Sequence, residues 1–393
     1  MKKSLSDVGL AENVRLAEIR VENDSMSLTK KVTERIYRDD ILLSQSKIDS
    51  FNTCPLAYFC RYDLGLSENE QAEFDARNIG SFIHAVLENF FAMQSKNEKP
   101  LGELTPEEKQ EMIKASAEKY LESVMPEGDI KSVRSSLLIK RLIRASSPII
   151  DGLCEEFAGS RYLPRYFEMR IGGRGELCPE LLTVTDEDGK RTMIKGSVDR
   201  VNTYKFGDDV YVRVADYKTG QKAFKPKDLE KGKNLQMFLY LAAVIDTKNN
   251  ALRRDIGVTE NGRLIPAGVI YVKSDLTDVK ISHSSAEDEI RAVKADQKRQ
   301  GMLLDDSVSI SAMNTDFLPI KIKNDGSYYK GSEDFLYSEE GWKTLRSTVE
   351  DSVKRVSKKM RSGNISAEPM IENRTSPCAY CKFKSFCRNA KFQ

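Results

Sequence analysis

Two acidic residues and a lysine on adjoining strand patterns constrain this chain more than any other feature. Residues 194–202 and 210–218 both alternate β-branched and polar residues, and a short Gly/Asp turn separates them. This pattern predicts a β-hairpin. Asp216 and Lys218 share the parity of the valines at 210, 212 and 214, which places charged groups on an otherwise apolar face. A charged pair in that position requires a partner or a function.

A divalent cation would account for the charged pair. Asp199 in the first strand and Asp216 in the second would supply carboxylate oxygens, which Mg²⁺ and Mn²⁺ prefer. Lys218 would point into the same site and orient or deprotonate a water, or offset charge on a phosphate. The alternative is a strand end at which Lys218 only pairs with Asp216. Gln236 and Tyr240 lie one helical turn apart, where an amide and a phenol can hold a phosphate or a base edge.

Four motifs, taken together and in order, give the chain a resemblance to a known enzyme family. They are Gly80-Ser-Phe-Ile-His84, Gly196-Ser-Val-Asp199-Arg200, Asp216-Tyr217-Lys218-Thr219-Gly220 and Gln236-x-x-x-Tyr240. The set resembles the RecB-like branch of the PD-(D/E)XK nucleases, and within it the C-terminal nuclease modules of helicase/nuclease B subunits (AddB), over residues 44–388. The resemblance implies an α/β fold with a mixed central β-sheet of the restriction-endonuclease type, flanked by helices.

The resemblance also implies roles for these residues. Asp199, Asp216, His84 and the carbonyl of Tyr217 would bind Mg²⁺ or Mn²⁺, Lys218 would serve the nucleophile, and Gln236 and Tyr240 would position DNA. A lone histidine on an apolar helix face is ordinarily a structural group, but the chain has only two histidines and the family places a ligand after Gly80. Similar nucleases often carry a glutamate on the strand before the Asp motif, which makes Glu168 a further candidate near the metal.

The cysteines predict a second centre. Cys378, Cys381 and Cys387 provide three thiolates, and Cys54 is the candidate for the fourth ligand that a tetrahedral metal or an iron–sulfur cluster needs. Spacing alone leaves zinc, iron–sulfur and free thiols open, whereas the resemblance implies a 4Fe–4S cluster. Closing a loop of ~100 residues stabilises a fold by about 4.7 kcal/mol, so such a cluster would act as a staple. The remaining cysteines are predicted to be small buried hydrophobes: Cys60, Cys154 and Cys178.

Composition limits how the chain meets its partners. A net charge of +2 gives no global attraction to nucleic acid, so DNA binding must come from a local basic patch. The densest such run beside the predicted metal is a phosphate track that includes Lys222, Lys225 and Lys227. No apolar stretch reaches the length of a membrane span and no signal sequence is recognisable, so we expect a cytoplasmic protein.

The expected organisation is a charged leader at residues 1–43 and a nuclease domain at residues 44–393. The domain would carry a helical insertion at about 100–160 and a terminal subdomain stapled by the cysteine tail at 378–387. No P-loop ATPase motif is present. The resemblance leads us to expect a metal-dependent exonuclease acting on linear single- or double-stranded DNA ends, with a helicase partner, in double-strand-break repair and recombination. The alternative is a non-catalytic iron–sulfur scaffold that binds DNA ends; the intact acidic and lysine set argues against it.

Overall fold

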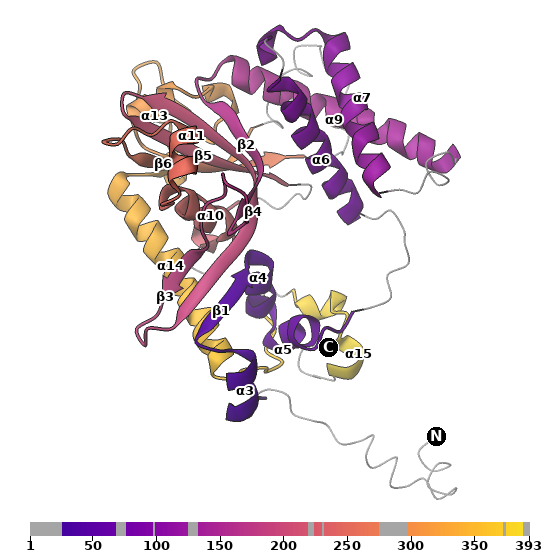
Figure 1. The fold of residues 1–393 in the computed structure, drawn as a ribbon, viewed down its shortest axis with the longest axis vertical. Helices are drawn as coiled ribbons and strands as arrows, with labels where there is room; N and C mark the ends of the chain where they lie inside the picture. Colours follow the sequence, from indigo (N-terminus) through magenta and orange to yellow (C-terminus); the bar gives the residue numbers. More distant parts are fainter. Residues whose placement is uncertain are drawn as a thin grey trace, which may run out of the picture. The chain divides into compact units, whose positions relative to one another are not determined.

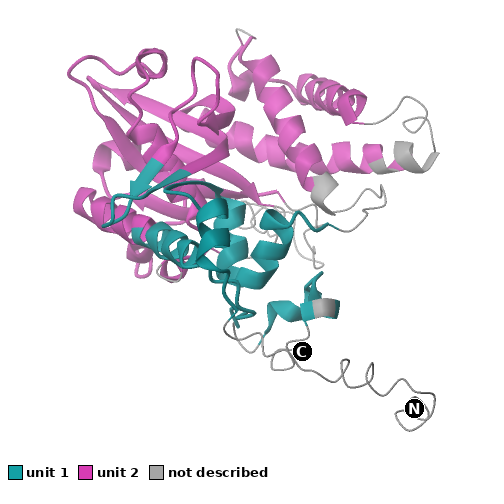
Figure 2. Ribbon diagram, turned by 60° about the horizontal axis from the view of Figure 1, so that its bottom comes forward, with its two compact units in different colours: residues 1–71, 183–193, 351–393 teal, residues 72–182, 194–350 magenta. Residues whose placement is uncertain are grey.

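The structure is a computed structural model, which describes residues 26–67, 76–96, 99–124, 133–218, 224–229, 232–274, 298–371 and 375–387. The chain divides into two compact units (Figure 2). Unit 1 comprises residues 1–71, 183–193 and 351–393, and unit 2 comprises residues 72–182 and 194–350. Within the described residues, no helix has both the length and the apolar character that crossing a membrane would require.

An eight-stranded mixed sheet forms the centre of the fold. Its order is β1-β4-β5-β6-β7-β8, and β2 and β3 also pair with β4 (Figure 1). The β5–β6 and β7–β8 pairs are parallel, whereas β2–β4, β4–β5 and β6–β7 are antiparallel. The predicted mixed α/β fold is therefore confirmed. The strands are β1 Asp40–Ser44, β2 Leu163–Ile171, β3 Leu182–Thr185, β4 Arg191–Phe206, β5 Asp209–Lys218, β6 Leu264–Lys273, β7 Gln300–Leu304 and β8 Leu336–Tyr337.

The predicted hairpin is formed by β4 and β5. The two strands pair from Arg200 opposite Ala215 to Phe206 opposite Asp209. Strand β5 is buried along nearly its whole length, as expected for a central strand that is covered on both faces. The alternation of valines therefore places Asp216 inside the molecule, at the end of a core strand.

Three long helices of unit 2 pack against one another. They are α6 (Ala76–Gln94), α7 (Pro106–Val124) and α9 (Val133–Ala158), and they group together in Figure 1. Helix α7 begins with a reciprocal capping box. The Thr105 N–H donates to Glu108 Oε2 at 2.7 Å, and the Glu108 N–H donates to Thr105 Oγ1 at 3.2 Å. Within the described residues, η2 (Leu101–Glu103), α7 and α9 make up most of the range 100–160.

The apolar face of α6 is buried as its periodicity predicts, and its members are Phe82, Ile83, Val86, Leu87 and Phe90. Helix α10 (Gln236–Ile245) packs on β5 and β6. The other short elements of unit 2 are η2 Leu101–Glu103, η3 Pro226–Asp228, α11 Asn250–Ile256, α13 Ser307–Ser311, η4 Thr315–Phe317 and η5 Glu333–Phe335.

Unit 1 joins the two ends of the described chain. It contains α3 (Lys30–Ile36), α4 (Gln45–Thr53), α5 (Pro55–Tyr58), a π-helical turn η1 (Phe59–Asp63), η6 (Pro377–Tyr380) and α15 (Lys384–Cys387). Helix α14 (Glu339–Arg361) begins in unit 2 and ends in unit 1. The N–H of Leu56 donates to the Ser366 carbonyl at 3.2 Å, and the N–H of Met370 donates to the Thr53 carbonyl at 2.8 Å. Backbone hydrogen bonds therefore hold the Cys54 segment beside the C-terminal segment.

Candidate functional site

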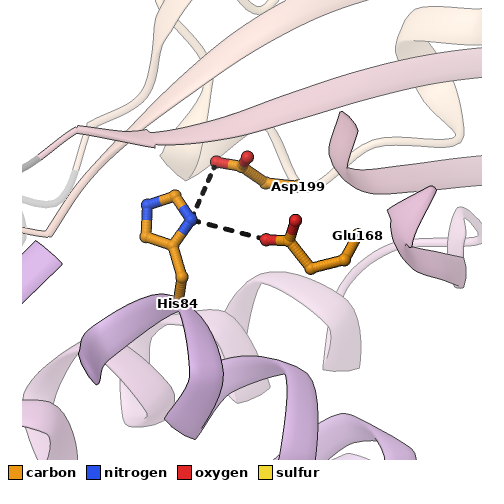
Figure 3. A group of neighbouring side chains, drawn as sticks. All are labelled: His84, Glu168 and Asp199. Carbon is orange, nitrogen blue, oxygen red and sulfur yellow. Dashed lines mark ion pairs between the residues drawn. The ribbon is translucent and has the colours of Figure 1, made fainter. Parts of the chain in front are cut away.

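Three side chains from three elements converge in unit 2. His84 comes from α6, Glu168 from β2 and Asp199 from β4, and their ligand atoms all lie within 4.8 Å of one another. His84 Nδ1 is 3.5 Å from Glu168 Oε1 and 3.5 Å from Asp199 Oδ2 (Figure 3). Across the part of the chain that the structure describes, this is the one group of three or more histidine, cysteine or carboxylate side chains at such spacing.

The register of β2 and β4 sets Glu168 opposite Asp199. Phe167 pairs with Arg200 and Met169 pairs with Val198, so the residues between them face each other. Glu168 has a backbone φ of 48°, which is the left-handed region that a glutamate rarely adopts. Such a conformation costs on the order of 1–3 kcal/mol and is found mainly at functional sites. Two carboxylates in opposite positions also repel each other, so the arrangement favours a cation between them.

The end of β5 completes the site. Asp216 is 3% exposed, and Lys218 Nζ lies 2.7 Å from Asp216 Oδ2. Between them, the Tyr217 N–H donates to Asp199 Oδ2 at 2.7 Å, and His84 Nε2 donates to the Tyr217 carbonyl at 3.0 Å. The structure therefore brings His84, Asp199 and Tyr217 into direct contact. Asp216 lies outside the group of three.

The pKa shifts of Asp199 and His84 reflect the negative charge gathered in the site. Burial raises the pKa of Asp199 to about 7, and the charge of Asp216 adds to this, although His84 and the Tyr217 N–H oppose it. Burial lowers the pKa of His84, but hydrogen bonding to Glu168 and the charge of Asp199 outweigh it and raise the value to about 9. The hydrogen bond from His84 lowers the pKa of Glu168. Protons bound to His84 and Asp199 and a bound cation would therefore balance the same negative charge.

Tyr240 meets β4 in a notch at Gly196. The tyrosine is 3% exposed, and a Cβ on Gly196 would lie 2.0 Å from its Oη. Glycine at this motif position is therefore required for the phenol to fit. Gln236 is the first residue of α10 and is half-buried. Contact of Gln236 and Tyr240 with DNA stays a prediction, and the burial of Tyr240 indicates that it also shapes the strand that carries Asp199.

The predicted phosphate track is partly described. Lys225 and Lys227 are exposed, beside and within η3. Lys222 lies outside the described residues. The two described lysines are therefore available to solvent and to a phosphate backbone.

Unit 1 gathers the cysteines that the sequence singled out. Cys54 lies between α4 and α5, Cys378 lies in η6, Cys381 follows it and Cys387 ends α15. Cys54 and Cys387 pack against the same small core of Leu56, Cys60 and Ala367.

The Cys54 thiol is buried beside backbone N–H groups and two other thiols. Burial raises its pKa to about 11, the backbone N–H groups of Ala57 and Leu56 oppose this, and the charges of Cys387 and Cys381 add to it. A buried thiol with hydrogen-bond donors and two neighbouring thiols fits a shared metal or cluster. Cys60 and Cys154 are buried, as predicted, while Cys178 is half-buried.

Comparison with known proteins agrees with this geometry. The chain is 27% identical over 362 residues to a protein of Thermoanaerobacter sp. (strain X514) that is named as the B subunit of an ATP-dependent helicase/deoxyribonuclease, covering 90% of this chain and 30% of the relative. It is 27% identical over 387 residues to a protein of the same name from Acetivibrio thermocellus, covering 97% of this chain and 33% of the relative. The chain thus spans about a third of the length of these relatives.

The family comparison covers most of the chain. Residues 42–388 match the family described as the PD-(D/E)XK nuclease superfamily. This range contains the His84, Glu168 and Asp199 group, the end of β5 and the four cysteines that the sequence singled out as ligands. The chain belongs to the PD-(D/E)XK nuclease superfamily.

Proposed function

We propose that this chain is a Mg²⁺- or Mn²⁺-dependent deoxyribonuclease that shortens linear DNA from its ends. The observation that carries the proposal is the convergence of His84, Glu168 and Asp199, with Asp216 and Lys218 beside them at the end of a buried strand. Membership of a nuclease superfamily makes phosphodiester hydrolysis the reaction to test first.

The residues present suit a hard divalent cation. His84, Glu168, Asp199 and Asp216 and the carbonyl of Tyr217 would hold it, and oxygen-rich donor sets of this kind are typical of Mg²⁺ and Mn²⁺ sites. When bound, the metal would supply positive charge close to the scissile phosphate. It would also relieve the repulsion between Glu168 and Asp199, which face each other across two strands.

Lys218 is the cation that this chain itself brings to the reaction. Its side chain is 48% exposed, while its partner Asp216 is buried, so the ammonium group can reach a bound phosphate without leaving the site. In the hydrolysis, a water oxygen forms a bond to phosphorus, the bond to the leaving sugar oxygen breaks, and that oxygen gains a proton. Lys218 would orient the water or donate hydrogen bonds to the phosphate oxygens as charge builds there.

Cys54, Cys378, Cys381 and Cys387 of unit 1 would hold a 4Fe–4S cluster. Cys54 and Cys387 pack against the same small core, and the Cys54 thiol has the thiols of Cys381 and Cys387 as neighbours. A 4Fe–4S cluster is held by four cysteine thiolates. Its role would be to staple the Cys54 segment to the C-terminal segment.

The partners would be DNA ends and a helicase subunit. Relatives about three times as long as this chain are named as B subunits of an ATP-dependent helicase/deoxyribonuclease, which supports a helicase subunit as the partner. The role that we propose for the pair is cytoplasmic repair and recombination of double-strand breaks. Lys225 and Lys227 would contact the backbone of the strand that approaches the site.

The test is a cleavage assay with anaerobically purified protein. End-labelled single- and double-stranded linear DNA and closed circular DNA are incubated with EDTA, Mg²⁺ or Mn²⁺, alone and with the helicase subunit. We expect metal-dependent shortening of linear DNA and little cutting of circles. DNA binding without hydrolysis under every condition would instead establish the non-catalytic scaffold.

A further inference from the structure

A buried arginine lies directly behind the proposed metal site. Arg200 follows Asp199 on β4, and its side chain is fully buried. Its Nη1 donates a hydrogen bond to Tyr217 Oη at 2.9 Å. Its guanidinium also lies over the rings of Tyr217 and Phe157, at 5.4 Å and 4.9 Å from their centroids. Arg200 is thus packed against the tyrosine whose backbone forms part of the site.

The hairpin register separates these side chains from the carboxylates. Arg200 pairs with Ala215, so Arg200 and Tyr217 are diagonal neighbours on one face of the β4–β5 hairpin. Asp199 and Asp216 each precede one of them, so they point to the opposite face. Tyr217 therefore has its ring fixed on one face while its peptide groups meet the site on the other.

The geometry points to Arg200 as a positioning residue for the metal site. By fixing the phenol ring of Tyr217, Arg200 sets the direction of the Tyr217 N–H, which holds Asp199 at 2.7 Å, and of the Tyr217 carbonyl, which faces His84 at 3.0 Å. This inference rests on the proposed function, because the ordered groups are the proposed ligands of the divalent cation.

Burial alone would raise the pKa of Glu156, and the charge of Arg200 contributes to lowering it, but the ion pairs of that carboxylate are with two other arginines. The buried Glu156 pairs with Arg213 at 2.9 Å and with Arg299 at 3.0 Å. Within the described parts of the chain, Arg200 Nε and Nη2 are buried without a hydrogen-bond partner. Burying a cation with unsatisfied donors costs free energy of folding. Positioning of Tyr217 would explain why an arginine is kept here despite that cost.

A matched pair of tyrosine variants tests the inference. Tyr217→Phe removes the hydroxyl that Arg200 holds. Tyr162→Phe removes another buried hydroxyl, which lies 2.8 Å from Ser309 Oγ, and this ring also lies under a guanidinium, that of Arg213 at 5.1 Å. The readouts are the Kd for Mn²⁺ from an electron paramagnetic resonance titration and the Tm of the metal-free protein.

Tyr217→Phe should weaken Mn²⁺ binding by about tenfold, the lower end of the usual effect of residues that orient ligands. Each variant loses one buried hydroxyl, so we expect Tyr162→Phe and Tyr217→Phe to lower the Tm of the metal-free protein by similar amounts. Tyr162→Phe should leave the Kd for Mn²⁺ unchanged. Arg200→Gln should act like Tyr217→Phe, and Arg200→Lys, which keeps a buried cationic donor, should restore part of the affinity.

Two results would overturn the inference while the metal site stands. One is wild-type Mn²⁺ affinity in Tyr217→Phe, and the other is an equal loss of affinity in Tyr162→Phe. If the wild-type protein itself binds no Mn²⁺, the proposed metal site fails and the inference fails with it.

Discussion

Glu168 and Asp199 face each other across β2 and β4, and the imidazole of His84 lies 3.5 Å from both carboxylates. This arrangement is unfavourable for an isolated pair of strands, because it opposes like charges and holds Glu168 at a φ of 48°. A cation resolves the conflict, and in its absence the imidazolium of His84 takes that role. Proton and metal should therefore compete for the site.

The first prediction is that Mn²⁺ binding releases protons. The pKa of His84 is raised to about 9 and that of Asp199 to about 7, so at pH 8 the metal-free site carries a proton on His84 while Asp199 is ionised. Binding should release about one proton at pH 8, and affinity should rise between pH 7 and pH 9. Calorimetry in buffers of different ionisation enthalpy measures the release. Equal heats in all buffers would contradict the assignment.

The raised pKa of His84 also determines how the stability of the metal-free protein changes with pH. Because the folded-state pKa of His84 is raised from 6.5 to about 9, its protonation stabilises the metal-free protein fully below pH 6.5. That contribution is lost as pH rises through about 9. Metal-free wild-type protein should therefore lose Tm as pH rises from 6.5 through 9, which a series of thermal melts measures.

The second prediction concerns the notch at Gly196. Gly196→Ala would place a methyl group 2.0 Å from Tyr240 Oη, so the tyrosine or β4 must move. Overpacking of this kind costs about 1–3 kcal/mol, and the shift of β4 should also weaken Mn²⁺ binding. Urea unfolding measures the first effect and a Mn²⁺ titration the second.

Gly341→Ala is the control for the notch. It lies in α14, and its nearest neighbours would be 3.3 Å from the new Cβ, so they need to move by only a few tenths of an ångström and we expect a much smaller loss of stability and no loss of Mn²⁺ affinity. If both glycine variants behave like the wild type, the close contact between Gly196 and Tyr240 does not shape the site.

The third prediction concerns the cysteines of unit 1. Anaerobically purified protein should contain iron and acid-labile sulfide in equal amounts, with visible absorption. Cys54→Ser should lose both and lower Tm, because Cys54 lies between α4 and α5 and packs against the same core as Cys387. The buried thiol of Cys154 provides the control, since Cys154→Ser should retain the cluster. Stoichiometric zinc without iron would refute the cluster.

The sequence predicted most of what local patterns encode. The β4–β5 hairpin follows from alternation and is confirmed. The buried face of α6 has the helical periodicity of its sequence, and a capping box marks the start of α7. These features depend on residues close together in the chain. For the same reason Asp216 and Lys218 could be assigned to one face of β5 before any contact was known.

Long-range contacts were harder to predict. Glu168 was only one candidate among several acids, because nothing in its neighbours reveals the φ of 48° or the register that sets it opposite Asp199. The hydrogen bond between Arg200 and Tyr217 depends on how β4 and β5 align. The two residues belong to different sequence motifs, and neither motif reveals the contact. The burial of Tyr240 likewise depends on a glycine on another element.

The fourth prediction is that the end of β5 performs chemistry. Asp216→Asn should remove a ligand charge, and Lys218→Ala should remove the cation that lies 2.7 Å from Asp216. Loss of one such electrostatic contact commonly costs on the order of 10²–10³ in rate. DNA affinity should persist in both variants, because it comes mainly from phosphate contacts made by other lysines. Lys225→Ala combined with Lys227→Ala should show the reverse, with weaker binding and intact chemistry in the bound complex.

Single-turnover cleavage of end-labelled linear DNA by Lys218→Ala decides whether this strand end is catalytic, with enzyme in excess and the DNA Kd measured alongside. We expect wild-type binding and a cleavage rate reduced by about 10²–10³. Cleavage at the wild-type rate, or a loss of cleavage explained wholly by lost DNA binding, would show that Lys218 and Asp216 form only a structural ion pair at the end of the strand.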